Sequence, residues 1–438
     1  MTLSVTGVST PAKRLLATLL PIALLSAPLP LLAQPAGNSV TDASVYDELP
    51  LEDIQTFAEV FERIKRAYVE EVDDRTLLRN AMRGMLSELD PHSAYLDEEE
   101  YQSLRESTQG EFGGIGIEVG TENGQLMVIT PIDDTPASRA GLQSRDIIVA
   151  IDGTPTDSMS LQEAVTLMRG EPDTEIRISV LRSGEDTPRE FTLTREIIRS
   201  ESVKHELLEP GYGYLRISQF QSRTPDQARE ALERLAQDQP LEGLILDLRN
   251  NPGGVLQAAV GITDLFLDEG LIVYTEGRLS DTEMSFSASP TTPASDVPLV
   301  VLINGGSASA AEIVAGALQD QRRGVIMGTG SFGKGSVQQI MPLGNGEGLK
   351  LTTALYYTPN GRSIQAQGIE PDVEVVRGRL EVAESRREIR EADLEGHLSA
   401  QQAPRDRQEM AERLLDDYQL SEALNLLKAL NVVDRQRR

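Results

Sequence analysis

The 438-residue chain has no cysteine and only three histidines. The absence of cysteine excludes disulfides, thiolate nucleophiles and thiolate metal sites. The histidines, His92, His205 and His397, are scattered along the chain, and none belongs to the closely spaced pair that is typical of a metal site. We therefore expect no metal site and no cofactor.

Lysine is also scarce, because only six of the 41 basic residues are lysine and the rest are arginine. Arginine stays protonated in proteins, whereas a buried lysine can lose its proton and act as a base. One of the six, Lys334, lies between Gly333 and Gly335. Because lysine is rare here and Lys334 is flanked by glycines, Lys334 is a candidate for a catalytic base. The alternative interpretation is that Lys334 is an ordinary lysine in an exposed loop.

Positive charge is in short supply overall, since the formal net charge is −28. The sequence contains no basic stripe that could neutralise phosphates, which argues against nucleic acid as a partner. The same acidity argues against an anionic membrane surface as the main partner.

The first residues carry the pattern of an export signal. Lys13 and Arg14 precede an uncharged run from Leu15 to Ala33, as in secretory signal peptides. Prolines within that run disfavour a permanent membrane helix, and no later segment is apolar enough to span a bilayer. We predict that residues 1–33 are a cleaved signal peptide of an exported, periplasmic protein, and an uncleaved anchor is the alternative.

Helical segments are expected on both sides of the central domains. Residues 34–105 contain a polar leader and then apolar residues at helical spacing over 51–90. These apolar faces either pack within the domain or form a homodimer contact. Residues 378–438 are charged and largely helical, and the charge run around 381–393 fits a solvated surface. A docking face in this region would consist of Leu414, Leu415, Tyr418, Ala423, Leu426, Leu427 and Leu430.

Residues 106–195 have the pattern of a compact β-rich module. A glycine loop precedes alternating apolar residues, and a short helical turn ends at Gly141. Further strands are expected over 126–129, 146–151 and 175–181, with a helix over 161–169. This order resembles a PDZ domain, in which loop N–H groups capture a peptide carboxylate and a strand edge pairs with the peptide. The resemblance implies that the peptide-binding residues are Gly113, Gly114, Ile115 and Gly116.

Residues 196–377 alternate strands with helices, which indicates an α/β domain. Helices are expected over 224–236 and 309–319. Apolar strands are expected over 212–217, 241–248, 297–303, 324–328 and 348–356.

Ser309 follows a buried strand and a Gly-Gly turn, and it begins a helix. Its spacing to Glu312 is that of a capping box, so Ser309 could simply cap the helix, and Ser307 is an equally plausible cap. The same position also suits a nucleophile, because the free N–H groups and the positive dipole end of a helix N-terminus favour a developing oxyanion.

Two other segments favour the chemical interpretation. The segment from Leu248 to Gly254 follows a buried strand, and its glycines allow a backbone amide to face a site; an ordinary strand-to-helix turn is the alternative. Gln338 lies four residues after Lys334, which would bring the two side chains together on a helical turn. A neutral amide can hold the lysine amine, whose pKa burial must lower from about 10.4 if the lysine is to act as a base.

These three motifs, in this order and behind a PDZ domain, closely resemble those of the carboxyl-terminal processing proteases, over residues 51 to about 377. The resemblance implies an α/β, crotonase-like core and a serine endopeptidase that cleaves proteins near unstructured C-terminal tails. It implies Ser309 as the nucleophile, Lys334 as the general base and Gln338 as the residue that orients Lys334.

The same resemblance implies an oxyanion hole formed by the backbone amides of Gly254 and Ala310. The PDZ domain would bind the substrate tail and gate the active site, and Arg169 at the end of the PDZ helix would help to assemble that site. The expected partners are protein or peptide substrates with accessible tails and an activating adaptor.

Three rival functions fit these motifs less well. The intact set of Ser309, Lys334 and Gln338 argues against a PDZ-based binding protein with an inactive core. Export and the PDZ module argue against a crotonase-type acyl-CoA enzyme, because CoA thioesters are cytoplasmic. A Ser-His-Asp protease is disfavoured because no histidine lies in the three motifs.

Overall fold

The structure, a computed structural model, describes residues 50–122, 124–290, 294, 296–379, 414 and 416–437. The predicted signal peptide, most of the polar leader and the charge run around 381–393 lie outside the described residues. The chain divides into two compact units, residues 1–74 and residues 75–438, and each is described by itself.

The first unit contains helix α1 (Leu51–Ala67). Glu52 and Asp53 in its first turn and Lys65 and Arg66 in its last turn match the helix dipole. None of its residues is buried, so its apolar side chains are exposed, namely Leu51, Ile54, Phe57, Val60 and Ile64. The helix predicted here is confirmed.

The second predicted helix of this region is α2 (Asp74–Ser87). A turn and the short strand β1 (Ala94–Leu96) follow, and then helix α3 (Glu98–Gln109). A reciprocal capping box starts α3, because the Asp97 carboxylate accepts from the Glu100 N–H and the Glu100 carboxylate accepts from the Asp97 N–H, both at 3.0 Å.

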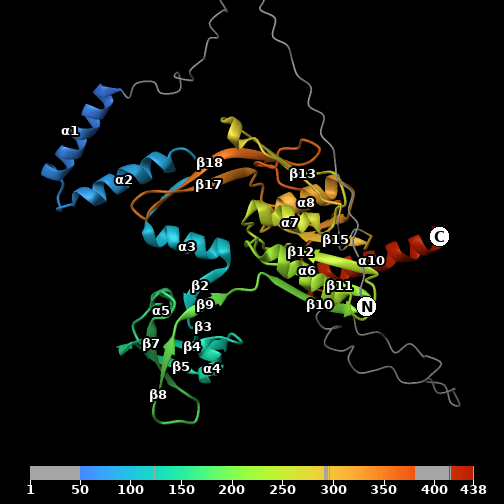
Figure 1. Ribbon diagram of the computed structural model, residues 1–438, viewed down its shortest axis with the longest axis horizontal. Coiled ribbons are helices and arrows are strands. Elements are labelled where there is room, and N and C mark those ends of the chain that lie inside the picture. The colour runs from blue at the N-terminus through green and yellow to red at the C-terminus, as the bar shows by residue number, and fades with distance from the viewer. Residues whose placement is uncertain are drawn as a thin grey trace, which may run out of the picture. The chain divides into compact units, whose positions relative to one another are not determined.

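The β-rich module is connected to the rest of the chain through a two-stranded ribbon. Strands β2 (Glu111–Gly114) and β9 (Glu196–Arg199) pair antiparallel at its entry and exit (Figure 1). Between them lies a sheet with the strand order β3-β4-β5-β7-β8, to which β6 adds beside β5. The elements of this module are β3 (Ile117–Glu122), β4 (Gln125–Pro131), α4 (Pro136–Ala140), β5 (Ile147–Ile151), β6 (Thr154–Pro155), α5 (Leu161–Met168), β7 (Glu175–Leu181) and β8 (Arg189–Thr194). The predicted strands and helix are confirmed.

The core domain is built on a six-stranded sheet of order β10-β11-β12-β15-β16-β19. Its strands are β10 (Val203–Glu209), β11 (Tyr212–Ile217), β12 (Gly243–Asp247), β15 (Leu299–Ile303), β16 (Val325–Gly328) and β19 (Val373–Glu374). All neighbours run parallel except β10 and β11. Such a sheet is buried on both faces, and β12 is buried along its whole length.

Successive residues of the central strands face different helices. Leu244 and Leu246 of β12 pack in one apolar cluster with α6 (Thr224–Leu235), α7 (Leu256–Asp264) and α8 (Ala310–Asp320). Ile245 packs in another cluster with α10 (Tyr418–Arg437), and α10 lies against strands β12 and β15 (Figure 1). The predicted docking face of the C-terminal region is confirmed at Leu414, Ala423, Leu426 and Leu427, whereas Leu415 lies outside the described residues. Leu420 and Leu424 also belong to this face.

A second, antiparallel sheet has the order β1-β18-β13-β14, and β17 also pairs with β18, over Gly348 to Leu355. Its core-domain strands are β13 (Leu271–Gly277), β14 (Ser285–Ser287), β17 (Ser336–Pro342) and β18 (Gly348–Tyr357), and a short 3₁₀ helix covers Ser280–Thr282. Strand β1 precedes the PDZ-like module in the chain yet pairs with β18. The sequence pattern predicted strands β11, β12, β15, β16 and β18. It did not predict β13, β14 and β17.

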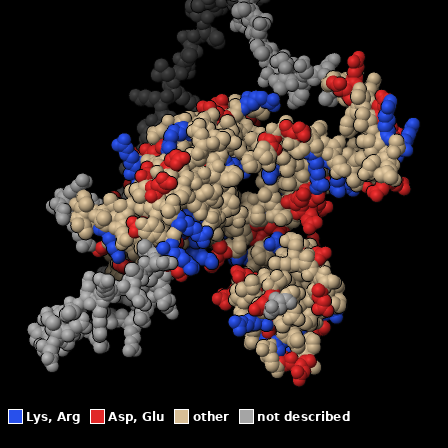
Figure 2. Space-filling view, turned by 180° about the vertical axis from the view of Figure 1, so that it is seen from behind, with Lys and Arg blue, Asp and Glu red and all other residues tan. Residues whose placement is uncertain are grey.

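Charged side chains of both signs are interspersed on the face shown in Figure 2. Among the described residues, no helix is both long enough and apolar enough to cross a membrane.

The packing of α10 predicts a large stability effect for one substitution. Leu427 is fully buried against the main sheet, so Leu427→Ala should lower the free energy of unfolding by about 2–5 kcal/mol. Urea unfolding measures the change. Val432→Ala is the matched control, because Val432 lies on the same helix and is 57% exposed, and equal losses for both variants would contradict the packing.

Candidate active site

Three loops meet at the carboxyl ends of neighbouring parallel strands. The loops follow β12, β15 and β16, and they carry the glycine segment that ends at Gly254, the turn with Ser309 and the segment with Lys334. In open α/β sheets this edge is where ligands bind. The topology therefore gathers the three motifs that are separate in the sequence.

Ser309 has a strained backbone, with φ 55° and ψ −114°, directly before α8. Such a conformation costs a non-glycine residue on the order of 1–3 kcal/mol and is typical of functional sites. Three hydrogen bonds hold it. The Ser309 N–H donates to the Glu312 carboxylate at 2.7 Å, and the Ser309 carbonyl accepts from the Glu312 and Ile313 N–H groups at 2.8 and 3.0 Å.

Ser307, the other predicted cap, instead joins two of the loops. Its buried hydroxyl donates to the Leu248 carbonyl at 2.8 Å and accepts from the Asn304 N–H at 3.0 Å. Asn304 and Asn250 also exchange hydrogen bonds between the same two loops. These contacts fix the nucleophile turn against the glycine segment.

The Glu312 carboxylate connects Ser309 to the lysine loop. It is fully buried, and one of its oxygens accepts from the N–H groups of Ser309 and Lys334, at 2.7 and 2.9 Å. The other oxygen accepts from the Ser331 hydroxyl and the Gly333 N–H, both at 2.6 Å. Four donors compensate for the cost of burying a carboxylate. The sequence pattern identified Glu312 only as a helix-capping partner.

Tyr356 is a second connection that sequence reasoning missed. Its hydroxyl donates to the Lys334 carbonyl and contacts the Ser309 side chain. Burial raises the pKa of Tyr356 well above its usual value, with the Glu312 carboxylate adding to the effect, so the phenol stays a neutral donor. An apolar strand pattern gives no signal for such a hydroxyl.

Lys334 is half-buried, and its environment lowers the pKa of its amine. Burial is the largest cause, and the neighbouring Lys350 ammonium lowers the pKa further. The Asp90 and Glu312 carboxylates act in the opposite direction. The direction of the shift is the one that a general base requires.

Gln338 does not lie on a helical turn with Lys334, so that part of the sequence interpretation is wrong. Residues 336–342 form strand β17, whose pairing with β18 provides the backbone hydrogen bonds that a helix would otherwise supply. The Gln338 amide nitrogen donates to the Ser336 hydroxyl at 2.9 Å and to the Thr352 hydroxyl at 3.2 Å.

The glycine segment approaches Ser309 closely. A Cβ atom on Gly253 would lie 2.8 Å from the Ser309 Cβ, and one on Gly254 would lie 2.0 Å from the Phe220 carbonyl oxygen. Gly254 also has φ +141°, which favours glycine. Neither the Gly254 nor the Ala310 amide donates a hydrogen bond within the described part of the chain.

The predicted peptide-binding residues of the PDZ-like module occupy two kinds of position. Gly113 and Gly114 belong to β2 and pair with β9, whereas Ile115 and Gly116 connect β2 to β3. Gly116 has φ +77° and packs on Thr135, whose hydroxyl donates to the Gly116 carbonyl at 3.1 Å.

Arg169 contacts residues of α3 and β2. Its guanidinium stacks on the Phe112 ring at 4.6 Å and pairs with the Glu106 carboxylate at 3.3 Å. Arg169 therefore connects the end of α5 to α3 and β2.

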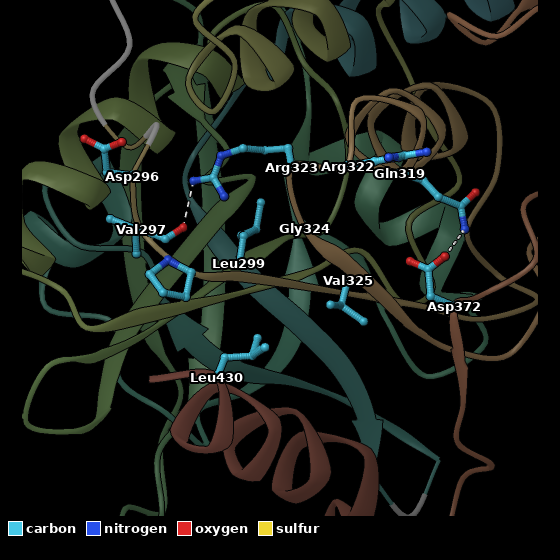
Figure 3. Close-up of a pocket in the computed structure, with 11 residues that line it drawn as sticks. Asp296, Val297, Leu299, Gln319, Arg322, Arg323, Gly324, Val325, Asp372 and Leu430 are labelled. Carbon is cyan, nitrogen blue, oxygen red and sulfur yellow. Dashed lines mark hydrogen bonds between the residues drawn. The ribbon is translucent and has the colours of Figure 1, made fainter. Parts of the chain in front are cut away.

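A groove of about 430 Å³ lies at the opposite ends of the parallel strands (Figure 3). It is lined by Leu299 and Val325 at the beginnings of β15 and β16. Its Arg323 donates to the Val297 carbonyl at 2.7 Å, so this guanidinium serves the fold. Among the described residues, no group of three or more acidic or histidine side chains could hold a metal ion.

Comparisons with known proteins match three parts of the chain to family models. Residues 211–375 match peptidase family S41, residues 127–182 match a PDZ domain, and residues 33–100 match the activating protease CtpB N-terminal domain.

Curated relatives extend the match over most of the chain. A carboxy-terminal-processing protease of Bartonella bacilliformis is 46% identical over 387 residues, which cover 85% of this chain and 87% of the relative. One from Synechocystis is 43% identical over 69% of this chain and 72% of its own. Among solved structures, a photosystem II D1 C-terminal processing protease is 33% identical with a TM-score of 0.44, over 74% of this chain and 92% of that one.

A PDZ domain joined to a serine-type peptidase domain defines the class of this protein. The chain belongs to peptidase family S41 and, within it, to the carboxy-terminal-processing proteases. The resemblance inferred from the motifs is confirmed.

The hydrogen bonds of Glu312 predict that stability and activity fall when one carboxylate oxygen is replaced by an amide NH₂ group. In Glu312→Gln, an amide NH₂ group would face two donors, so the variant should lose about 1–3 kcal/mol of unfolding free energy and most of its peptidase activity. Urea unfolding and a peptide-cleavage assay measure the two effects. The exposed Glu233→Gln should change neither, and a fully active, stable Glu312→Gln would contradict the role of the carboxylate.

Proposed function

We propose that this protease acts through a Ser-Lys mechanism, with Ser309 as the nucleophile and Lys334 as the general base. The observation that carries the proposal is the joint attachment of both residues to Glu312 and Tyr356. The lowered pKa of Lys334 supports the assignment, because a base must be neutral before it can accept a proton.

In the proposed reaction, the neutral Lys334 amine takes the hydroxyl proton of Ser309 as the serine oxygen attacks the scissile carbonyl carbon. The tetrahedral intermediate collapses by breaking the C–N bond, and the Lys334 ammonium gives its proton to the leaving amine. Lys334 then takes a proton from water as the water oxygen attacks the acyl ester. When the ester C–O bond breaks, the Lys334 ammonium returns that proton to the Ser309 oxygen, which releases the new carboxyl terminus and regenerates Ser309 and the neutral amine.

The negative oxygen of the tetrahedral intermediate would be held by the Gly254 and Ala310 amides. Both amides are free of other acceptors within the described chain, and Ala310 begins α8, whose dipole favours negative charge. Donors placed in this way stabilise a transition state by about 2.7–4 kcal/mol each. Gln338 would orient the Lys334 amine, and the core would belong to the crotonase-like folds.

The PDZ domain would select the substrate and control the site. A terminal carboxylate would bind near Gly113, Gly114, Ile115 and Gly116, and the rest of the tail would add to a strand edge. Arg169 would couple tail binding to assembly of the site, since it bridges α5 to α3. We further propose an exported, periplasmic enzyme that acts on unstructured C-terminal tails, with a homodimer through the helical regions and an activating adaptor as partners.

Substitution of the two catalytic candidates tests the mechanism. Ser309→Ala should abolish cleavage of an unfolded peptide with an apolar C-terminus. Lys334→Arg should lower kcat/KM by about 10²–10⁴-fold, because arginine keeps the charge but cannot act as the base. The exposed Lys204→Arg is the control, and wild-type rates in either site variant would refute the corresponding assignment.

The pH dependence of cleavage follows from the Lys334 environment. Activity should rise with pH through a Lys334 pKa that lies below the usual 10.5, because only the neutral amine is active. Lys350→Met removes a charge that lowers this pKa, so the rise in kcat/KM should move to higher pH. Lys204→Met should leave the profile in place, and an unmoved or acid-shifted profile for Lys350→Met would contradict the electrostatic account.

A further inference from the structure

The turn between α2 and β1 is built around an acidic side chain. One Asp90 oxygen accepts from the His92 and Ser93 N–H groups at 2.7 and 2.9 Å, and the other accepts from the Ser93 hydroxyl at 2.6 Å. Burial acts to raise the pKa of Asp90, but these hydrogen bonds and one from Thr352 outweigh it and lower the pKa. Asp90 is therefore an ionised carboxylate, which can only accept hydrogen bonds.

This turn is attached to the middle of strand β18. Pairing of β1 with β18 sets Ala94 opposite Lys350, and the Thr352 N–H donates to the Ser93 hydroxyl at 3.1 Å. The Thr352 hydroxyl donates to Asp90 at 3.2 Å. The start of the second unit thus reaches the same strand pair that carries Gln338.

A β-bulge brings Gln338 opposite Thr352. Val337 pairs with Ala354 but Gln338 pairs with Thr352, which leaves Thr353 as the extra residue of β18. Bulges re-aim side chains and are frequent beside active sites. Here the bulge allows the 3.2 Å hydrogen bond from the Gln338 amide nitrogen to the Thr352 hydroxyl.

The order of donors and acceptors fixes the orientation of the Gln338 amide. Asp90 accepts the only hydroxyl hydrogen of Thr352, so the Thr352 oxygen can only accept from its other neighbour. The Gln338 amide must therefore turn its nitrogen toward Thr352, and its second N–H meets Ser336 at 2.9 Å. Both N–H groups of the amide nitrogen are then in use, and the Gln338 Oε1 atom, on the opposite side of the amide, remains as an acceptor.

The Asp90 turn is one of three segments whose charges act on the Lys334 amine. The carboxylates of Asp90 and Glu312 and the ammonium of Lys350 all influence the pKa of Lys334. Burial and then Lys334 lower the pKa of His92, which belongs to the same turn. These groups come from the turn, α8 and β18.

We propose that Asp90 and Thr352 are positioning residues for the general base: through their hydrogen bonds they hold the Gln338 amide so that its Oε1 accepts from the Lys334 amine. The proposal rests on the proposed Ser-Lys mechanism. It gives the segment before the PDZ domain a defined part in catalysis, because Asp90 precedes that domain in the chain.

The experiment uses the full chain and compares three single variants, Thr352→Val, Thr352→Ser and Gln338→Ala. It also includes the double variant that combines Thr352→Val with Gln338→Ala. Thr353→Val is the matched control, because the Thr353 hydroxyl is buried and has no hydrogen-bond partner within the described residues. The measurements are kcat and KM on an unstructured peptide, the rate at which a fluorophosphonate labels Ser309, and thermal unfolding of each variant.

Thr352→Val should lower kcat and the labelling rate at least about tenfold, because the base is misplaced, with KM unchanged. Thr352→Ser should restore both rates, and Thr353→Val should match the wild type. In the Gln338→Ala background, Thr352→Val should cause no further loss, since residues that act through one another are not additive.

Four results would overturn the positioning proposal: a wild-type rate for Thr352→Val, a wild-type rate for Gln338→Ala, a change in KM alone, or the same loss from Thr352→Val in both backgrounds. The parent mechanism fails separately, if Ser309→Ala or Lys334→Arg retains activity. If Ser309→Ala and Lys334→Arg lose activity but Thr352→Val keeps the wild-type rate, only the positioning proposal is rejected.

Discussion

The burial of one carboxylate, that of Glu312, is the constraint on which the candidate active site depends. A buried carboxylate is tolerated only when donors surround it, and the donors here are the backbone of Ser309, the backbone of the lysine loop and a loop hydroxyl. Satisfying Glu312 therefore requires the nucleophile turn and the Lys334 loop to be in place together. The strained backbone of Ser309 is maintained by the same requirement.

The chain surrounds this site with contacts from distant segments. Arg249, which follows β12, pairs with Asp247 and with Asp417 beside α10, so the C-terminal region supports the glycine segment. The turn at Asp90 reaches the site from the other direction, through β1 and β18. The PDZ domain is inserted between these contributions, on the β2–β9 ribbon.

Much of the architecture was predictable because burial determines where apolar residues occur in the sequence. The run over 299–303 is apolar at every position, as expected of a parallel strand covered on both faces. The capping-box spacing from Ser309 to Glu312 marked the start of α8. The family motifs then identified a carboxy-terminal-processing protease, which the curated relatives confirm.

The sequence by itself determined the family, the order of the domains and the candidate side chains, because these depend on local pattern and on residue identity. It misjudged the segment after Lys334, where a four-residue spacing suggested a helix. Pairing with β18, the next strand in the chain, made that segment a strand, and the spacing between Lys334 and Gln338 carries no sign of that pairing. Only the tertiary structure decided that Glu312 and Tyr356 hold Ser309 and Lys334 together and that Asp90 reaches the strands behind them. These are contacts between segments, and their energy depends on burial and donor geometry that no single segment encodes.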